Sequence, residues 1–458
     1  MRKKNQKQMP LMDRSIDHPR AYELRDISRI LDEIPIINKM VLQDLTREVE
    51  HRDRGAEGMS AEQVVRAAIV KQMEEFSYDD LAFHIVDSRC YRSFCRIGIA
   101  DKGFGKSTLC SNIKAISPET WEATNRILVA YGEDNKIEKG RAVRMDCTVV
   151  SSNIHDPSDS SLLWDSVRVL TRMLAQINER FEGEGLKISF SDHTKRAKRR
   201  MLGVMNANGE KARKKQYLDL LKMTGKVVNY ATSAVSILET FPFEHVSVWD
   251  CAQRMAEDLQ QVITLTQKVI DQTTRRVVYG DSVAACEKIF SIFEPHTDII
   301  IKDRRDTFYG HKVCLSGGAS NLITDCLIVD GNPADSTLTD QMLDRQEQIY
   351  GRYPLKVALD GGFASKDNLA SAKGKNIKDV CFAKKRGLEI EEMCRSEYVY
   401  KRLRRFRAGI ESGISWLKRC FGFARCTWKT LRSFKSYVWA SIVSANLLTL
   451  ARSSDATT

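Results

Sequence analysis

The apolar residues of this chain follow two different periods in separate long stretches, and these periods constrain the fold more than any other feature. In Arg141–Val150 (RAVRMDCTVV) every second residue is apolar, which is the period of a β-strand and leaves Asp146 on the polar face. From about Ser161 to Gln267 apolar residues recur at helical spacing, as in the stripe from Leu163 to Ile177. Strand-like patterns then return. The sequence therefore predicts an α/β protein with a long helical segment after its first strand.

The later strand-like segments are short and separated by turn signals. They are Thr297–Lys302, Tyr309–Leu315, Leu322–Val329, Leu355–Leu359 and Ile377–Phe382. The second and third are joined by the Gly-rich hairpin Ser316–Ser320 (SGGAS), and the fourth ends in Asp360-Gly361-Gly362, where glycines impose a sharp turn. Helices are predicted over Ser336–Tyr350, Arg395–Lys418 and Ser433–Leu450, the last of them apolar.

The region before the first strand is predicted to be helical. Ser60 and Gln63 form a capping box ahead of an apolar run, and further helices are expected from Ser77, near Ser107, and from Ser117 to Val129. Residues 1–55 form a basic arm with one helix near Ile27–Ile37. Short helices with tight turns suit a helix-turn-helix DNA-binding module, and they suit a plain helical bundle equally well.

The composition is that of a soluble protein with a polyanionic partner. For 458 residues two or three domains are expected, and 42% hydrophobic with 29% charged residues excludes wholesale disorder. Lys and Arg outnumber Asp and Glu by 72 to 60, and this net charge of +12 favours an acidic partner. The N-terminus (MRKKNQKQMP) has no apolar signal core, no apolar run could span a membrane, and the twelve cysteines include no CxxC pair. We therefore expect a reduced cytoplasmic compartment and no membrane association.

Three carboxylates stand where metal-dependent phosphoryl transfer would need them. Asp146 lies in mid-strand, Asp360 follows a buried strand, and Glu411 shares a helix face with Arg407 and Lys418. Hard oxygen ligands on rigid elements suit a pair of Mg²⁺ ions. Each acid alone has an ordinary explanation, as an exposed strand residue, a turn former or a solvated helix residue. Only their conjunction indicates a catalytic site.

Two basic segments accompany these acids. Residues 195–215 contain nine Lys or Arg and one Glu, and residues 384–435 contain fifteen Lys or Arg against five acids. A solvated basic surface explains either run alone. Two runs together with a candidate phosphoryl-transfer site favour DNA-phosphate binding, which would be salt-dependent. The candidate DNA-binding residues of the first run are Lys195, Arg196, Arg199, Arg200, Lys214 and Lys215.

Several blocks of the chain resemble the DDE-type transposases of bacterial insertion sequences, most of all the ISNCY-type branch. MDCTVVSSNIHDPSDSSLLWDSVRVL (residues 145–170) is similar to the first-aspartate block of that family, and VALDGGFAS (357–365) to the second. EPHTDIIIK, YGHK and DGNPADS resemble its intervening strands, and RFRAGIESGISWLKRCFG resembles its glutamate block. SAEQVVRAAIVKQMEEFSYDDLAFHIVDSRCYRSFCRIGI resembles its helical DNA-binding domain.

The resemblance implies a fold and a set of site residues. Asp146, Asp360 and Glu411 would be the catalytic metal-binding triad, holding two Mg²⁺ ions for which Mn²⁺ can substitute, and Arg407 and Lys418 would contact DNA. The tyrosine of the helix signature falls at Arg404 here, which puts its role in doubt or passes it to Phe406. The implied fold is an RNase H-like mixed sheet with flanking helices, interrupted by a long helical insertion and preceded by an all-α DNA-binding domain. The implied boundaries are an arm at 1–55, the DNA-binding domain at 56–135, the catalytic domain at 140–155 and 294–432, the insertion at 156–293, and a C-terminal helix and tail at 433–458.

The implied activity is metal-dependent cleavage at the ends of a mobile element and joining of the 3′ hydroxyls to target DNA. The sequence leaves two alternatives open: an RNase H-like nuclease without joining activity, and a catalytically silent DNA-binding protein derived from a transposase. The partners would be double-stranded DNA and at least a second copy of the chain, with the apolar C-terminal helix as one candidate dimer surface. The protein would reside in the bacterial or archaeal cytoplasm, associated with the nucleoid.

Three other sequence patterns give weaker evidence of a functional site. Lys102–Thr108 (KGFGKST) lacks the first glycine of a phosphate-binding loop, since that position is Ala100, so no nucleotide cofactor is expected. His155, Asp156 and Asp159 fit a turn around Pro157 better than a second metal site. The aromatic residues Trp416, Phe421, Phe423 and Trp428 are most simply core residues around the catalytic helix.

Overall fold

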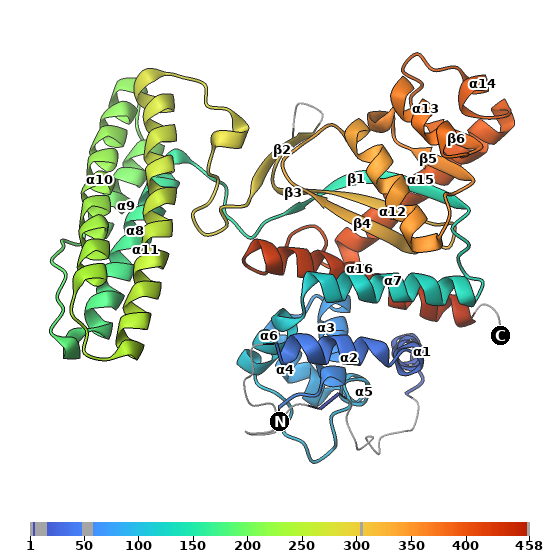
Figure 1. The fold of residues 1–458 in the computed structure, drawn as a ribbon, viewed down its shortest axis with the longest axis horizontal. Coiled ribbons are helices and arrows are strands. Elements are labelled where there is room, and N and C mark those ends of the chain that lie inside the picture. The colour runs from blue at the N-terminus through green and yellow to red at the C-terminus, as the bar shows by residue number, and fades with distance from the viewer. Residues whose placement is uncertain (1–2, 5–15, 48–57, 303–305, 456–458) are drawn as a thin grey trace. The chain divides into compact units, whose positions relative to one another are not determined.

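The computed structural model describes residues 3–4, 16–47, 58–302 and 306–455, and it divides into two compact units (Figure 1). The first unit comprises residues 1–152 and 311–458, and the second comprises residues 153–310. The N-terminal arm predicted over residues 1–55 falls partly outside the described residues. Within the described ranges, no helix combines the length and apolar character needed to cross a bilayer.

The first unit combines a helical N-terminal part with most of a β-sheet and its flanking helices. Its N-terminal helices are α1 (Pro19–Glu33), α2 (Ile36–Leu45), α3 (Ala61–Met73), α4 (Tyr78–Asp87), α5 (Arg89–Phe94), α6 (Lys106–Ala115) and α7 (Pro118–Asp134). The strands are β1 (Ala142–Ser151), β3 (Asp306–Gly317), β4 (Ile323–Val329), β5 (Lys356–Leu359) and β6 (Asp379–Phe382). The other helices are η4 (Asp335–Leu338), α12 (Thr339–Tyr350), η5 (Gly361–Phe363), α13 (Lys366–Gly374), α14 (Ile390–Met393), α15 (Glu397–Cys420) and α16 (Leu431–Asp455).

The second unit is a helical bundle with a short strand at its end. Its elements are α8 (Asp159–Arg180), η1 (Glu182–Glu184), α9 (Thr194–Met205), α10 (Glu210–Thr240), α11 (Val246–Thr273), η2 (Thr274–Tyr279), η3 (Ala285–Glu287) and β2 (Asp298–Lys302). The capping box of Ser158 with Ser161 begins α8. The predicted apolar stripe from Leu163 to Ile177 is confirmed as the buried face of α8, which packs against α9, α10 and α11.

The strands form one mixed sheet in the order β2-β3-β1-β5-β6, with β4 also paired to β3. β1, β5 and β6 run parallel, whereas β2 and β4 each pair with β3 antiparallel. Every strand predicted from the sequence is confirmed, as is the hairpin between β3 and β4. The predicted α/β class is therefore confirmed as a mixed α/β fold with a six-stranded sheet.

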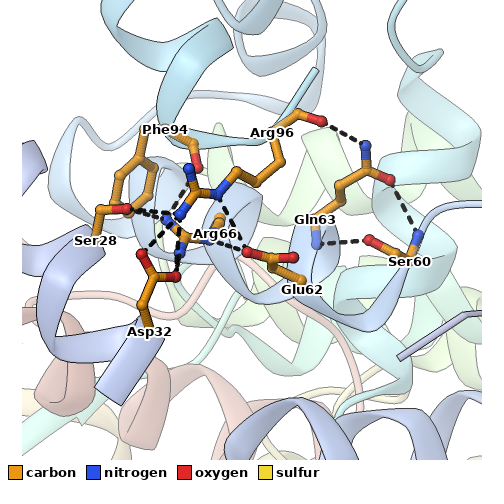
Figure 2. A network of polar contacts seen from close by, with 8 residues as sticks. All are labelled: Ser28, Asp32, Ser60, Glu62, Gln63, Arg66, Phe94 and Arg96. Atoms are coloured by element: carbon orange, nitrogen blue, oxygen red, sulfur yellow. Dashed lines mark hydrogen bonds and ion pairs between the residues drawn. The ribbon is translucent and has the colours of Figure 1, made fainter. Parts of the chain in front are cut away.

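The capping box predicted at Ser60 and Gln63 is confirmed and begins the central helix of the N-terminal part (Figure 2). Every residue of α3 is buried, including the charged Glu62 and Arg66. A burial pattern of this kind makes α3 the core of its helical group and leaves it no face for DNA. The predicted helices from Ser77, near Ser107 and from Ser117 are also confirmed, as α4, α6 and α7.

A compact polar network keeps the charges of α3 satisfied inside this core. Arg66 donates to Glu62, to Ser28 and to Asp32, and Arg96 donates to the same Glu62 and Asp32 carboxylates (Figure 2). A buried ion that lost its partners would be costly, so the two cations and two anions must be retained together. The network thereby ties α1, α3 and the segment after α5 to one another.

The helix predicted near Ile27–Ile37 differs from the structure. Two helices cover this region, α1 and α2, and Pro35 separates them. Proline disfavours helical geometry at the preceding residue and lacks the amide hydrogen that a continuous helix needs. The apolar pattern runs across the break because both helices bury residues such as Ile30 and Ile37 in the same core.

The apolar C-terminal helix is confirmed as α16, but its prediction as a dimer surface is wrong. Its side chains from Phe434 to Ala451 are almost all buried against the N-terminal helices and the sheet. Figure 1 shows α16 beside α7 within the first unit, and the two helices are in extensive contact. Asn446 fixes this packing by accepting from the Ile323 amide at 2.9 Å and donating to Asn125 at 2.7 Å. The apolar pattern reflects burial within one chain.

Candidate active site

The pairing of β1 with β5 brings two of the predicted carboxylates together. The last register pair is Met145 with Leu359, so Asp146 and Asp360 occupy adjacent positions on neighbouring parallel strands. Asp146 lies within β1, and its carboxylate accepts from the Cys147 amide at 2.8 Å. Asp360 immediately follows β5 at its carboxyl end. The sheet register alone therefore accounts for their proximity, although 214 residues separate them in the sequence.

The third carboxylate is carried by α15, which packs on β1, β5 and β6. Ser396 caps this helix by accepting from the Val399 amide, and Lys418 and Arg419 lie in its last turn, where cations complement the helix dipole. Its buried residues, Tyr400, Leu403, Ile410 and Leu417, form one stripe and orient the opposite edge of the helix outward. Glu411 and Arg407 therefore lie one turn apart beside the sheet.

Arg407 joins all three carboxylates. Its Nη2 donates to Glu411 Oε1 at 2.7 Å, and its Nη1 lies 3.3 Å from Asp360 Oδ1 and 3.8 Å from Asp146 Oδ2. Burial lowers the pKa of Arg407, but the hydrogen bond and the charges of the three acids outweigh it and raise that pKa above its ordinary value. The structure thus brings Asp146, Asp360 and Glu411 together around the guanidinium of Arg407.

Arg407 still has unused donor capacity. Its side chain is 14% exposed, and its Nε and Nη1 atoms make no hydrogen bond within the described residues. A guanidinium with free donors beside a cluster of carboxylates can bind a phosphate oxygen as well as the acids. Lys418, the other predicted DNA-binding residue of α15, lies seven residues beyond Glu411 and is half-buried.

A second arginine, which sequence reasoning did not identify, sets the position of α15. Arg144 is buried on β1, two residues before Asp146, and donates to the Phe406 carbonyl of α15 at 3.0 Å and to Asn321 at 2.6 Å. Its guanidinium also stacks on the Phe406 ring. It crosses α15 at Gly409, where a Cβ atom would overlap it. The available signals were an arginine on the polar face of the strand and a glycine within a helix.

The signature tyrosine falls at Arg404, and Phe406, the residue to which its role would pass, has a structural role here. Its ring and carbonyl both bind Arg144, whereas Arg404 is exposed. The predicted aromatic core residues Phe421, Phe423 and Trp428 are confirmed as buried, and Trp416 packs against Phe421. These aromatic contacts hold the end of α15 against the sheet.

The turn that carries Asp360 is braced by a neighbouring loop. Lys312, on β3, donates to the Pro333 carbonyl at 2.6 Å and to Asp335 at 2.9 Å. Asp335 lies against Gly362, and a Cβ there would come within 2.7 Å of its carboxylate. Gly361 is similarly packed against Lys384, and a Cβ at position 361 would lie 2.8 Å from the Lys384 Cβ. Neither glycine has a positive φ, so backbone conformation does not require glycine at these positions. The close approach of Lys384 and Asp335 explains why both positions in the predicted turn lack a side chain.

The basic residues predicted from the first charged run lie in the second unit, on α9 and α10. Lys195, Arg199 and Lys215 are exposed. Arg196 and Arg200 both bind Asp219, at 2.8 Å and 2.5 Å. Lys214 is partly buried and donates to the Val278 carbonyl at 2.9 Å. The run therefore combines fully available cations with others that have partners in the protein.

The remaining patterns have structural explanations. Asp159 lies in the first turn of α8 and binds Arg276 at 2.8 Å, and His155 lies 3.6 Å from Asp165, so these residues belong to the bundle. The segment Lys102–Thr108 leads from a loop into α6, and among the described residues before it there is no strand. Its Lys106 pairs with Asp79. This geometry lacks the strand that a phosphate-binding loop requires.

The carboxylates provide suitable donors for a divalent ion but are not arranged around one. Within the described ranges, no three Asp, Glu, His or Cys side chains are grouped closely enough to share a metal. Arg407 lies between the three acids instead. Hard carboxylate oxygens on two strands and a helix fit Mg²⁺ or Mn²⁺, and Asp360 and Glu411 are sufficiently exposed, at 39% and 54%, to turn toward an ion.

Two family models match the chain. One, described as a transposase DDE domain, matches residues 263–447, and the other, described as a transposase domain (DUF772), matches residues 12–115. The first match includes Asp360 and Glu411, whereas Asp146 lies between the two matches. No curated protein and no solved structure matches significantly. The matches name no branch, so the ISNCY-type assignment stays a prediction.

Proposed function

Because the chain belongs to the DDE-type transposases of insertion sequences, we propose that Asp146, Asp360 and Glu411 form its catalytic metal-binding site. The observation that carries the proposal is the convergence of these acids on Arg407 from β1, from the end of β5 and from α15. Three acids that share one cation form a site with a strong preference for positive charge. The parallel β1, β5 and β6 with antiparallel β3 and β4 support an RNase H-like catalytic domain.

The chemistry assigned to this site is phosphodiester cleavage followed by strand transfer. Two Mg²⁺ ions, when bound, would activate the attacking oxygen and stabilise the leaving oxygen of an in-line displacement. The chain supplies rigid oxygen ligands, since two of them are set by strand register and the third by the docked helix. Transposases of this family depend on divalent metal, and Mg²⁺, with Mn²⁺ as a substitute, is our proposal for the ion.

Arg407 and Lys418 are proposed to bind the DNA backbone next to the reacting phosphate. Arg407 has two buried donor atoms, Nε and Nη1, that make no hydrogen bond to any described residue, and it lies within reach of all three acids. With the charge of the acids neutralised by a bound ion, the Arg407 guanidinium would be available to bind a phosphate oxygen. In this arrangement Arg407 would neutralise the three acids in the absence of metal and would bind a DNA phosphate once a metal is present.

The experiment that tests the proposal replaces Asp360 with asparagine, which preserves size and removes charge. Strand cleavage at the element ends should be abolished while binding of the end DNA remains, because the Asp360 side chain is 39% exposed and pairs with Arg407 at the surface of the site. Asp367 provides a matched control, since it is an aspartate in the first turn of α13 with no place among the three acids. Cleavage by Asp360→Asn at the wild-type rate would refute the assignment.

A strand-transfer assay with precut ends distinguishes joining from cleavage alone. Joining of the 3′ hydroxyl ends to target DNA is expected, and the transposase families matched by the chain favour neither a nuclease without joining activity nor a silent DNA-binding protein. Duplex DNA is the proposed partner, both as element end and as target. Pairing two ends calls for at least two copies of the chain, with a contact surface other than α16.

A further inference from the structure

A row of four lysines runs along the exposed face of α10 in the second unit. Lys211, Lys215, Lys222 and Lys226 are separated by four, seven and four residues, a spacing that places all four on one side of a helix. All four are exposed, and among the described residues none forms an ion pair with a carboxylate. At 1.5 Å per residue, this α10 lysine row is about 22 Å long. Lys222 and Lys226 lie outside the basic run found in the sequence.

The neighbouring helix α9 extends this basic surface sideways. Arg196 and Arg200 of α9 reach Asp219, which lies on α10 between Lys215 and Lys222. The two arginines therefore neutralise the only acid within the row and fix α9 alongside it. Lys195 and Arg199, one turn apart on α9, are exposed as well. Apart from Asp219, the stretches 195–200 of α9 and 211–226 of α10 carry positive charges alone, and we call their exposed cations the α9–α10 surface.

This concentration of charge opposes folding. Lys211 with Lys215, Lys222 with Lys226, and Lys195 with Arg199 are like-charge pairs four residues apart, which destabilise a helix. Lys211 also lies in the first turn of α10, where the helix dipole disfavours a cation. By contrast, α11 in the same bundle mixes acids and bases along its length. The stability of the bundle therefore does not account for the lysine row.

We propose that the α9–α10 surface binds the phosphate backbone of duplex DNA. Duplex DNA presents one phosphate per ~3.4 Å on each strand, so the row matches the length of about six phosphates. Flexible lysine ammonium groups contact phosphates without reading sequence, which makes this a positioning surface for DNA of any sequence. The choice of DNA over other polyanions rests on the proposed transposase function.

The test uses the full-length protein with all four lysines of the row changed to glutamine. Binding of an element-end duplex and of a random duplex is measured over a series of salt concentrations. The slope of log affinity against log salt should become shallower by about three to four, because each lost phosphate contact contributes about 0.9. The loss should be equal on both duplexes. Thermal stability should not fall, since the change removes like-charge pairs.

A matched control removes four other exposed cations of the same unit. Arg180, Lys187, Arg254 and Lys268 are exposed and lie off the row, so their change to glutamine lowers the net charge equally. The control should keep the wild-type slope. An unchanged slope in the lysine-row variant, or an equal loss in the control, overturns the proposal.

The proposed active site is tested separately in the same assay. Asp360→Asn should lose cleavage and keep the wild-type salt slope. If the wild-type protein cleaves but the lysine-row variant keeps its slope, only the surface proposal fails. If the wild-type protein neither cleaves nor binds DNA, the transposase function fails with it.

Discussion

Changing Arg407 to glutamine should make the protein bind Mn²⁺ more tightly than the wild type does. The guanidinium contacts Glu411, Asp360 and Asp146 at 2.7, 3.3 and 3.8 Å, and an ion bound by these acids must replace it. The partners are partly exposed, so each contact is worth roughly 0.2–1 kcal/mol, and the three together about 1–3 kcal/mol. At about 1.4 kcal/mol per tenfold change, the affinity should rise by roughly 5- to 150-fold.

Isothermal titration calorimetry at fixed ionic strength measures this change directly, without any reaction. Without metal, Arg407→Gln should also unfold at a lower temperature, because three neighbouring acids lose their shared cation, and Mn²⁺ should restore more stability than in the wild type. Arg405→Gln is the matched control, since Arg405 is an exposed arginine on the same helix. Equal or weaker Mn²⁺ binding by a folded Arg407→Gln protein would show that Arg407 does not compete with metal.

Three further predictions concern buried positions. Gly409→Ala should displace the Arg144 guanidinium from its two acceptors, which lowers the free energy of unfolding by about 2–4 kcal/mol and slows cleavage. In denaturant unfolding, the double variant Gly409→Ala, Arg144→Met should lose less stability than the sum of the losses in the two single variants, because the two residues are in contact. Burial lowers the pKa of Lys71 to about 8, so folding disfavours its protonated form. Lys71→Met should therefore stabilise by about 1–3 kcal/mol at pH 7, and its advantage should shrink as pH rises from about 8 past 10, as urea unfolding at several pH values can test. Arg66→Met should destabilise by about 3 kcal/mol because Glu62 loses one of its cations, whereas a double Arg66→Met, Glu62→Leu protein should recover part of this loss in thermal unfolding; no recovery would contradict a shared network.

The strands were predictable because alternation along a strand reports directly which face is buried. The strand predicted over Arg141–Val150 is β1 from Ala142 to Ser151, and Val143 and Met145 are buried as expected. The same reasoning treated the other face as polar and exposed, whereas Arg144 is buried there. Periodicity cannot show that a helix from the far end of the chain covers that face. It therefore finds the element but not both of its neighbours.

The limits of pattern reading are clearest for α16. A helix of serines, alanines and large apolar residues can be buried within its own chain or against a second copy, and both environments select the same residue types. What distinguishes them is pairing between distant positions, such as Asn446 with Asn125 and Ile323. A single sequence does not contain that information, so pattern alone predicts a dimer surface on a helix that is buried within its own chain.

The acids of the candidate site are brought together by contacts that are not themselves part of the chemistry. Asp146 and Asp360 are adjacent because Met145 pairs with Leu359, and Glu411 faces them because Arg144 fits over Gly409. Folding therefore brings three negative charges to one place at an electrostatic cost, and Arg407, four residues before Glu411 on the same helix, offsets it. Because Arg407 and Glu411 lie on the same helix, docking of α15 on the sheet brings the cation and the third acid to the site together. Arg407 thus offsets the negative charge of the three acids during folding, before any metal binds, and the same residue is the one we propose to bind the substrate phosphate.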